Sequence, residues 1–277
     1  QILSIPLEDP KNIIHISPSD EIRVKTTDPA IPTDEKGLIF RAAKLMLEQF
    51  PNKVEPVDVF SEENIPPSSG LGGGSADAAA VIKGINQLFN LGLSTDELLE
   101  LSMIPDEDGR ILGSDVPLCI YNRPCIVKGK GDRIEPLNLC LEDDILLVIP
   151  TLTAIMNKTA VVYSVFDACK MSCPEIPDVD DVIAWDDEAN PRVIYDRLGN
   201  SFTELPIEFL KKSFEIIETF NGVDGVRHVG LAGAGPTVYF ILDDRRSSNV
   251  IYSVRSYLSG YTDDTRVIIT KQLTTNN

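Results

Sequence analysis

The sequence predicts a mixed α/β (α+β) chain that is organised in two halves. Strand-like alternation and helix-like spacing of apolar side chains follow one another, as at 22–26 and 37–50. A continuous apolar run at 145–149 has the composition of a buried strand and is expected to begin the second half. With 277 residues, of which 43% are hydrophobic, the chain is long enough for two domains that each bury a core.

The first half is predicted to alternate strands with helices. Apolar side chains recur at helical spacing over 37–50, and a capping-box pattern at Ser94 and Glu97 predicts the start of a later helix. Short alternating or apolar runs predict strands, and the last two of these are expected to form a hairpin around a glycine turn. The predicted strands cover 22–26, 54–60, 120–127 and 132–137.

The second half is predicted to contain the same two kinds of element. Helical spacing and apolar runs again alternate along the chain, and no internal repeat is present in the sequence. The predicted helices cover 159–169, 206–220 and 247–258, and the predicted strands cover 145–149, 237–242 and 265–270.

A glycine-rich loop that runs directly into an alanine-rich helix carries the clearest functional signal. Four of the five residues at 70–74 are glycine, so the backbone can approach a ligand closely and point successive N–H groups at one anion. Ser75 is the predicted N-cap of the helix, and Asp77 is predicted to lie in its first turn. The predicted phosphate-binding loop comprises Pro66, Pro67, Ser68, Ser69, Gly70, Leu71, Gly72, Gly73, Gly74, Ser75 and Ala76.

Spacing argues against three other interpretations of this loop. A Walker loop requires a lysine before the Ser/Thr, and the sequence Gly74-Ser75-Ala76 has none. A dinucleotide fingerprint requires a strand that feeds straight into the glycines, which Pro66 and Pro67 interrupt, and Ser75 stands in place of its third glycine. A flexible glycine linker is disfavoured because an amphipathic helix begins without a gap.

The pattern Pro-x-x-x-Gly-Leu-Gly that begins at Pro66 resembles the ATP loop of the GHMP kinases, the superfamily of galactokinase, homoserine kinase and mevalonate kinase. Its extension Gly-Gly-Ser-x-Asp-Ala-Ala is similar to the branch that phosphorylates 4-diphosphocytidyl-2-C-methyl-D-erythritol in the methylerythritol phosphate pathway of isoprenoid biosynthesis. Further segments resemble this branch in the same order along the chain. They are residues 112–117, 129–132, 159–163, 198–200 and 230–238.

The resemblance implies a fold, a reaction and a set of site residues. It implies a ribosomal-protein-like, ATP-binding GHMP kinase domain over 1–143, N-terminally incomplete, and a ferredoxin-like domain over 144–277, with ATP between them. Asp115 is implied as the catalytic aspartate; taken alone, it is also a plausible helix N-cap. Ser75 is implied to lie at Mg²⁺ or phosphate, and plain helix capping is the alternative. Gly233, Ala234 and Gly235 are implied to lie near substrate or phosphate, and a simple turn into a strand is the alternative.

One departure from the family pattern bears on activity. The family begins with a Pro-Ala-Lys-(Ile/Leu)-Asn-Leu strand, whose lysine pairs with the catalytic aspartate, and a Gly-Tyr-His segment that helps to hold cytidine; the printed sequence contains neither. Ala76 and Asn64 also differ from the usual residues, and 103–110 is a short acidic insertion. The sequence is therefore either truncated or that of a catalytically inactive nucleotide-binding relative. A homoserine or mevalonate type of GHMP kinase is a further alternative.

The charge of the chain restricts its partners. Lys and Arg number 25 against 43 acidic residues, giving a net charge of −18, and no basic stripe that could bind nucleic acid is present. An acidic protein that binds ATP must offset its own field, so Mg²⁺ is an expected cofactor. Lys128, Lys130 and Arg133 are candidates for a local positive charge, and a solvated hairpin turn explains them equally well.

The sequence predicts no membrane partner and no metal centre of its own. No apolar run is long enough to span a bilayer, and Gln1 to Pro10 lacks the features of a signal peptide. The five cysteines lack paired zinc-site spacing and are interpreted as buried thiols in a reducing compartment. We expect a bacterial cytoplasmic enzyme, or a plastid-type location in a eukaryote, that acts on a small cytidine-diphosphate-linked methylerythritol as a monomer or homodimer.

Overall fold

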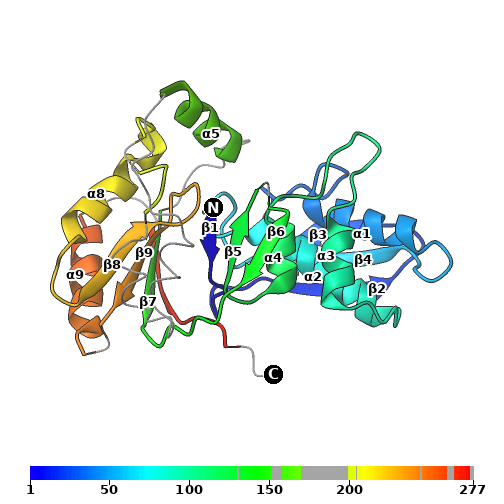
Figure 1. The fold of residues 1–277 in the computed structure, drawn as a ribbon, viewed down its shortest axis with the longest axis horizontal. Coiled ribbons are helices and arrows are strands. Elements are labelled where there is room, and N and C mark those ends of the chain that lie inside the picture. Colours follow the sequence, from blue (N-terminus) through cyan, green and yellow to red (C-terminus); the bar gives the residue numbers. More distant parts are fainter. Residues whose placement is uncertain are drawn as a thin grey trace. The chain divides into compact units, whose positions relative to one another are not determined.

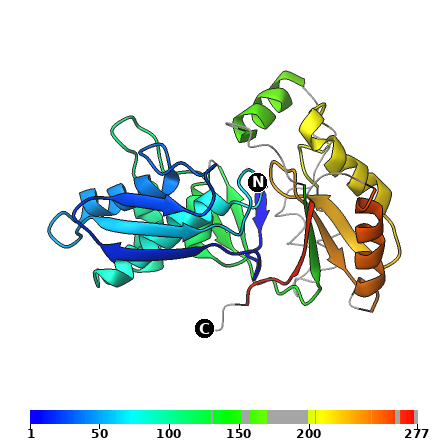
Figure 2. The same cartoon turned by 180° about the vertical axis from the view of Figure 1, so that it is seen from behind.

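The chain is described by a computed structural model (Figures 1 and 2). It describes residues 1–129, 131–150, 158–169, 199–203, 205–243, 245–260 and 265–274. The chain divides into two units, which are described separately. Unit 1 comprises Gln1–Pro6, Lys11–Pro67 and Gly72–Leu137, and unit 2 comprises Leu7–Pro10, Ser68–Leu71 and Asn138–Asn277. The domain limits predicted from the sequence, 1–143 and 144–277, stay a prediction.

Unit 1 contains two sheets of three strands each. In the first, the central strand β4 (Val57–Glu62) pairs antiparallel with β2 (Ile13–Pro18) and parallel with β3 (Arg23–Thr26). In the second, β5 (Cys125–Lys128) pairs antiparallel with both β1 (Ile2–Ser4) and β6 (Arg133–Pro136). The strands predicted over 22–26 and 54–60 are confirmed with shifted ends, whereas β1 and β2 were not predicted.

The helices of unit 1 cover one face of the β2-β4-β3 sheet (Figures 1 and 2). The helices α1 (Leu38–Gln49) and α2 (Gly73–Leu88) contact each other, and both contribute small and large side chains to one core, including Ala42, Ala78, Met46 and Ile82. The capping box is confirmed, because Ser94 Oγ accepts from Glu97 N–H at 3.3 Å and Ser94 N–H donates to Glu97 Oε2 at 2.8 Å. The helices are α1 (Leu38–Gln49), α2 (Gly73–Leu88), α3 (Thr95–Ser102) and α4 (Val116–Tyr121).

The strand predicted over 120–127 is wrong in its first half. Residues up to Tyr121 belong to α4, and Asn122, with a φ of 52°, ends that helix in the left-handed conformation. Pro124 follows and cannot continue a helix, so the strand starts only at Cys125. The hairpin of β5 and β6 is confirmed; Lys130 in its turn lies outside the described residues.

Unit 2 is built on a four-stranded antiparallel sheet with the order β10-β7-β9-β8. Its strand β7 (Ile145–Pro150) is buried along its whole length, and β10 (Thr265–Thr270) has the limits that the sequence predicts. The helices α8 (Lys211–Phe220) and α9 (Ser247–Leu258) lie against one face (Figure 1). In the core between helices and sheet, Phe220 packs edge-on against Phe240. The remaining elements are β8 (Val226–Leu231), β9 (Val238–Leu242), α5 (Lys158–Cys169) and the 3₁₀ turn η1 (Glu208–Leu210).

Several expectations drawn from composition can be compared with the described residues. Cys125 is buried, but Cys140 and Cys169 are exposed, so the prediction of buried thiols is wrong for these two; Cys173 lies outside the described residues. No group of three or more potential metal ligands occurs among the described residues. The described helices include none that is long and apolar enough to cross a membrane.

Candidate functional site

The first glycine-rich loop turns into α2 earlier than the sequence predicts. Gly72, with a φ of 74°, is the N-cap, and the helix begins at Gly73. The predicted N-cap role of Ser75 is therefore wrong, and Asp77 lies beyond the first turn instead of within it. The physical reason is that glycine adopts a left-handed φ without a Cβ clash, so the chain can enter the helix before it reaches the serine.

The N-terminus of α2 presents backbone N–H groups without a side-chain cap among the described residues. The first backbone bond of the helix joins Ala76 N–H to Gly72 O at 3.0 Å. Within the described part of the chain, no side chain caps this end. The first N–H groups of a helix have no partner within it, and with the helix dipole they attract anions. The start of α2, from Gly73 to Ser75, thus has the chemistry of a phosphate site.

Ser75 lies beside the segment that carries Asp115. A methyl group built on Gly113 would lie 3.9 Å from Ser75 Oγ. Gly131, in the β5–β6 turn, packs even more tightly on this segment, because a Cβ built on it would overlap the carbonyl oxygen of Ser114. Its φ of 93° is also one that favours glycine. Unit 1 therefore brings together the start of α2, the Asp115 segment and the turn at Gly131, all of which the family resemblance singled out.

The carboxylate of Asp115 is not used as a helix cap. Asp115 occupies the N-cap position of α4, but its side chain caps no N–H group of the described residues. Asp115 is exposed to solvent, and partial desolvation by the surrounding protein nevertheless raises the pKa of its carboxyl above the ordinary value of 3.8. The pKa of the neighbouring Cys119 thiol is raised to about 12, first by burial and then by the charge of Asp115. An accessible carboxylate with a raised pKa and no capping role is well suited to accept a proton.

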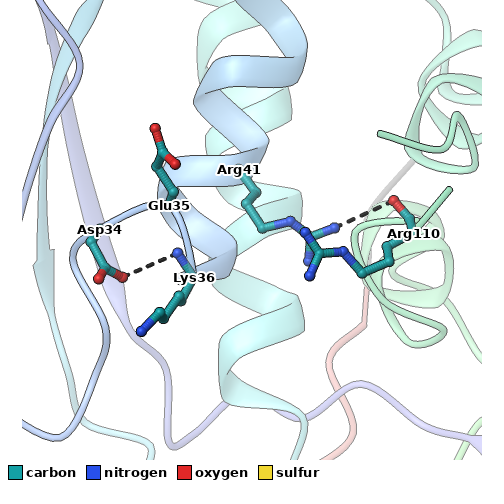
Figure 3. A pocket seen from close by; sticks show the side chains of 5 residues that line it. All are labelled: Asp34, Glu35, Lys36, Arg41 and Arg110. Atoms are coloured by element: carbon teal, nitrogen blue, oxygen red, sulfur yellow. Dashed lines mark hydrogen bonds between the residues drawn. The ribbon is translucent and has the colours of Figure 1, made fainter. Parts of the chain in front are cut away.

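Arg41 of α1 holds the loop that leads to Asp115. Its guanidinium donates to Ile111 O at 3.0 Å and to Asp106 Oδ2 at 3.1 Å. Figure 3 shows the Arg41 guanidinium hydrogen-bonded to the carbonyl of Arg110, at 3.4 Å. Both residues line a cavity of about 550 Å³, together with Asp34, Glu35 and Lys36. The acidic insertion at 103–110 is thereby anchored to α1. Nothing in the sequence pattern indicated this role for Arg41.

The charge of Lys128 in the hairpin is already paired. Its Nζ lies 2.8 Å from Glu135 Oε2, within the same pair of strands. Arg133 is exposed, and Lys130 lies outside the described residues. This arrangement favours the interpretation of the cluster as a surface hairpin over a role in neutralising phosphate.

The second glycine-rich loop lies in unit 2, and side chains hold its carbonyl groups. Asn200 Nδ2 donates to Leu231 O and Gly233 O, both at 2.8 Å. Lys158 Nζ donates to Ala234 O at 3.3 Å and to Gly235 O, and Ser213 Oγ donates to Pro236 O at 2.6 Å. Because its carbonyls are fixed, the loop has one defined conformation.

Lys158 is a buried cation that sequence reasoning did not identify. It lies at the start of α5, directly before the matched segment that begins at Thr159. Burial lowers the pKa of Lys158 to about 8. Its partners are neutral carbonyl groups, at Ala234 and Gly235, which stabilise the ammonium through hydrogen bonds without cancelling its charge.

Residues Ser68–Leu71 of the first loop belong to unit 2 and contact the second loop there. Thr237 N–H donates to Ser69 O at 3.1 Å. A Cβ on Gly70 would lie 2.5 Å from Ala232 O and 2.6 Å from Gly235 O, so only glycine fits. The alternative interpretation of Gly233–Gly235 as a simple turn into β9 is thus incomplete, because this turn also holds part of the first loop.

Comparisons with known proteins identify similar sequences and folds. Residues 37–123 match the model of the GHMP kinases N terminal domain. The 4-diphosphocytidyl-2-C-methyl-D-erythritol kinase of Nostoc punctiforme is 30% identical over 98% of this chain and 86% of that protein, and that of Trichormus variabilis is 31% identical over 94% and 84%. A crystal structure of 4-(cytidine 5'-diphospho)-2C-methyl-D-erythritol kinase matches with a TM-score of 0.65 and 21% identity, over 95% of this chain and 87% of that one.

Proposed function

Because this chain belongs to the family of 4-diphosphocytidyl-2-C-methyl-D-erythritol kinases, within the GHMP kinases, we propose that it phosphorylates the 2-hydroxyl of 4-diphosphocytidyl-2-C-methyl-D-erythritol with ATP. This reaction belongs to the methylerythritol phosphate pathway, which supplies isopentenyl diphosphate. The bacterial origin of these relatives supports a location in a bacterial cytoplasm. As a monomer or homodimer, the chain would act on a small molecule and on no nucleic acid.

The observation that carries this proposal is the position of Ser75 next to the Asp115 segment. The N-terminus of α2 supplies donors for phosphate, and Gly113, two residues before Asp115, packs beside Ser75 at that same end. An anion site and an uncommitted carboxylate in one region are the parts that phosphoryl transfer to a hydroxyl requires. Neither part alone would distinguish a kinase from a protein that only binds a nucleotide.

The chain's own groups have distinct roles in the proposed reaction. N–H groups of Gly73, Gly74 and Ser75 donate to phosphate oxygens, where they neutralise charge without moving. Asp115 orients the substrate hydroxyl and accepts its proton, a role generally worth about 10²–10⁴ in rate. The raised pKa of Asp115 makes its ionised form a stronger base than an aspartate with an ordinary pKa.

The residues present fit Mg²⁺ only as a partner of the nucleotide. The described residues contain no three-ligand acidic cluster that would hold the ion alone. Mg²⁺ usually keeps several waters and binds through one or two protein groups together with substrate phosphates. Ser75 Oγ is the group of unit 1 that would complete such a site. When bound, Mg²⁺ neutralises charge on the phosphate groups.

The substrate assignment can be tested by competition. Turnover of ATP is measured with 4-diphosphocytidyl-2-C-methyl-D-erythritol, with homoserine and with mevalonate, each in the presence of added cytidine diphosphate. We expect turnover with the first compound alone, and we expect cytidine diphosphate to inhibit it. Turnover with homoserine or mevalonate that cytidine diphosphate does not affect would assign the chain to another type of GHMP kinase.

A further inference from the structure

One asparagine side chain contacts both ends of the first glycine-rich loop. Asn12 lies directly before β2, and its Oδ1 accepts hydrogen bonds from Asn64 N–H at 2.7 Å and Ile65 N–H at 2.9 Å. Its Nδ2 donates to Asp77 Oδ1 at 2.8 Å. Asn64 and Ile65 immediately precede the loop, and Asp77 immediately follows it. A single amide therefore joins the two ends of the predicted phosphate loop.

This amide has no hydrogen-bonding capacity to spare. Its second donated bond goes to Glu63 Oε2 at 2.6 Å. A side-chain amide offers two N–H donors and two acceptor lone pairs, and all of them are used here. Backbone donors on one side and carboxylates on the other leave a single orientation for Asn12. The second oxygen of Glu63 is fixed in turn by Ser61 Oγ at 2.6 Å.

Burial makes the bond between Asn12 and Asp77 important for the start of α2. Asp77 is 1% exposed, and its Oδ2 has no hydrogen-bond partner among the described residues. Asn12 supplies the hydrogen bond to the other oxygen, so its loss would leave a buried carboxylate without compensation. Ile65 lies against the first residue of the helix, because a Cβ on Gly73 would be 3.0 Å from Ile65 Cγ2.

We infer that Asn12 is a positioning residue of the phosphate loop, whose amide fixes residues 63–65 relative to α2 and thereby aims the N–H groups at the start of that helix. The inference rests on the proposed function, in which these N–H groups bind ATP. A cradle that is already ordered binds its ligand without a further ordering cost. In this role Asn12 is not a catalytic residue and acts through residues 63–65 and Asp77.

Two substitutions at Asn12 distinguish the effect of its hydrogen bonds from the effect of its size. Asn12→Ala removes all four hydrogen bonds of the amide. Asn12→Asp keeps the shape but turns two donors into acceptors that face Glu63 and Asp77. The matched control is Asn86→Asp, at the other end of α2, where the amide exchanges two bonds of 3.0 Å with the Leu93 backbone.

The experiment measures the Kd for ATP by calorimetry and the KM for each substrate. For Asn12→Ala we expect the Kd and KM for ATP to rise on the order of tenfold, equivalent to about 1.4 kcal/mol, with the KM for the second substrate unchanged. Asn12→Asp should weaken ATP binding further, and Asn86→Asp should leave it unchanged. Thermal melting checks that each variant is folded. If Asn12→Asp does not fold, the result for Asn12→Ala decides the test.

The possible failures are distinguishable. Unaltered ATP affinity in Asn12→Ala would overturn the inference while leaving the proposed function intact. Equal increases in KM for both substrates would also overturn it, because they would indicate a general loss of structure. If the unaltered chain does not bind ATP, the proposed function is wrong, and the inference is wrong with it.

Discussion

The backbone N–H of Thr237 donates a hydrogen bond to the carbonyl of Ser69 at 3.1 Å. This bond joins a residue of the first glycine-rich loop to a residue of the segment 230–238, which contains the second one. Gly70, next to Ser69, lies so close to the carbonyls of Ala232 and Gly235 that no side chain fits between them. Two segments that are far apart in the sequence are thus held against each other in unit 2.

Gly70→Ala is expected to damage this contact more than its backbone conformation alone would suggest. A left-handed φ costs an alanine about 1–2 kcal/mol, and the methyl group would also collide with two carbonyl oxygens. The matched control is Gly92→Ala, since Gly92 has a φ of 72° with nothing within 4 Å of its Cβ position. Urea denaturation should show a larger loss for Gly70→Ala, together with weaker ATP binding. Equal losses in the free energy of unfolding for the two variants would show that the Gly70 contact does not contribute to stability.

Asp115→Asn is expected to abolish turnover and leave the fold intact. The substitution removes the base, so kcat should fall by at least about 10²-fold. Because the Asp115 carboxylate makes no capping bond, the melting temperature should not fall. Asp58→Asn is the control, because Asp58 pairs with Arg23 on an exposed surface and should not affect kcat. A kcat for Asp115→Asn close to that of the unaltered chain would remove Asp115 from the mechanism.

Asp77→Asn is expected to raise stability in a pH-dependent way. Burial raises the pKa of Asp77 from 3.8 to about 7, while the Asn12 bond lowers it and the charge of Glu63 raises it. Between these pH values the unfolded chain loses this proton before the folded chain does, so stability is highest below about pH 4 and falls up to about pH 7. The difference corresponds to roughly 4 kcal/mol.

Asparagine does not titrate, so the stability gain from Asp77→Asn should grow across this pH range and remain constant above it. Chemical denaturation at several pH values measures the free energy of unfolding of both chains. A gain that is the same at pH values below and above the range would show that the pKa of Asp77 is not raised in the folded protein.

Local patterns in the sequence predicted most elements of the fold, because the forces that form them are local. The limits of α9 and β10 follow from apolar spacing, and the capping box at Ser94 follows from two side chains on one turn. The errors arose where local signals conflicted. Ser75 is a good capping residue, but Gly72 adopts a left-handed conformation and caps the helix three residues earlier. The last residues of α4 are apolar, and such a run is equally typical of a strand.

The parts of the site that could not be predicted depend on contacts between distant residues. Asn12 and Arg41 have no distinctive sequence setting, and each acquires its role from carbonyl, amide or carboxylate groups dozens of residues away. Lys158 likewise depends on the carbonyls of Ala234 and Gly235. The loop at 66–76 and Asp115 stay predictions from the family resemblance, which marks residues expected to contact ligands and does not mark those that hold such residues in place.

The most direct test of the account is product analysis of the proposed reaction. The chain is incubated with ATP, Mg²⁺ and 4-diphosphocytidyl-2-C-methyl-D-erythritol, and phosphorus NMR follows the products, with Asp115→Asn in parallel. The account predicts ADP and a new phosphomonoester on the methylerythritol in equal amounts, formed by the unaltered chain alone. Binding of ATP without formation of the phosphomonoester, or equal rates in the two chains, would contradict it.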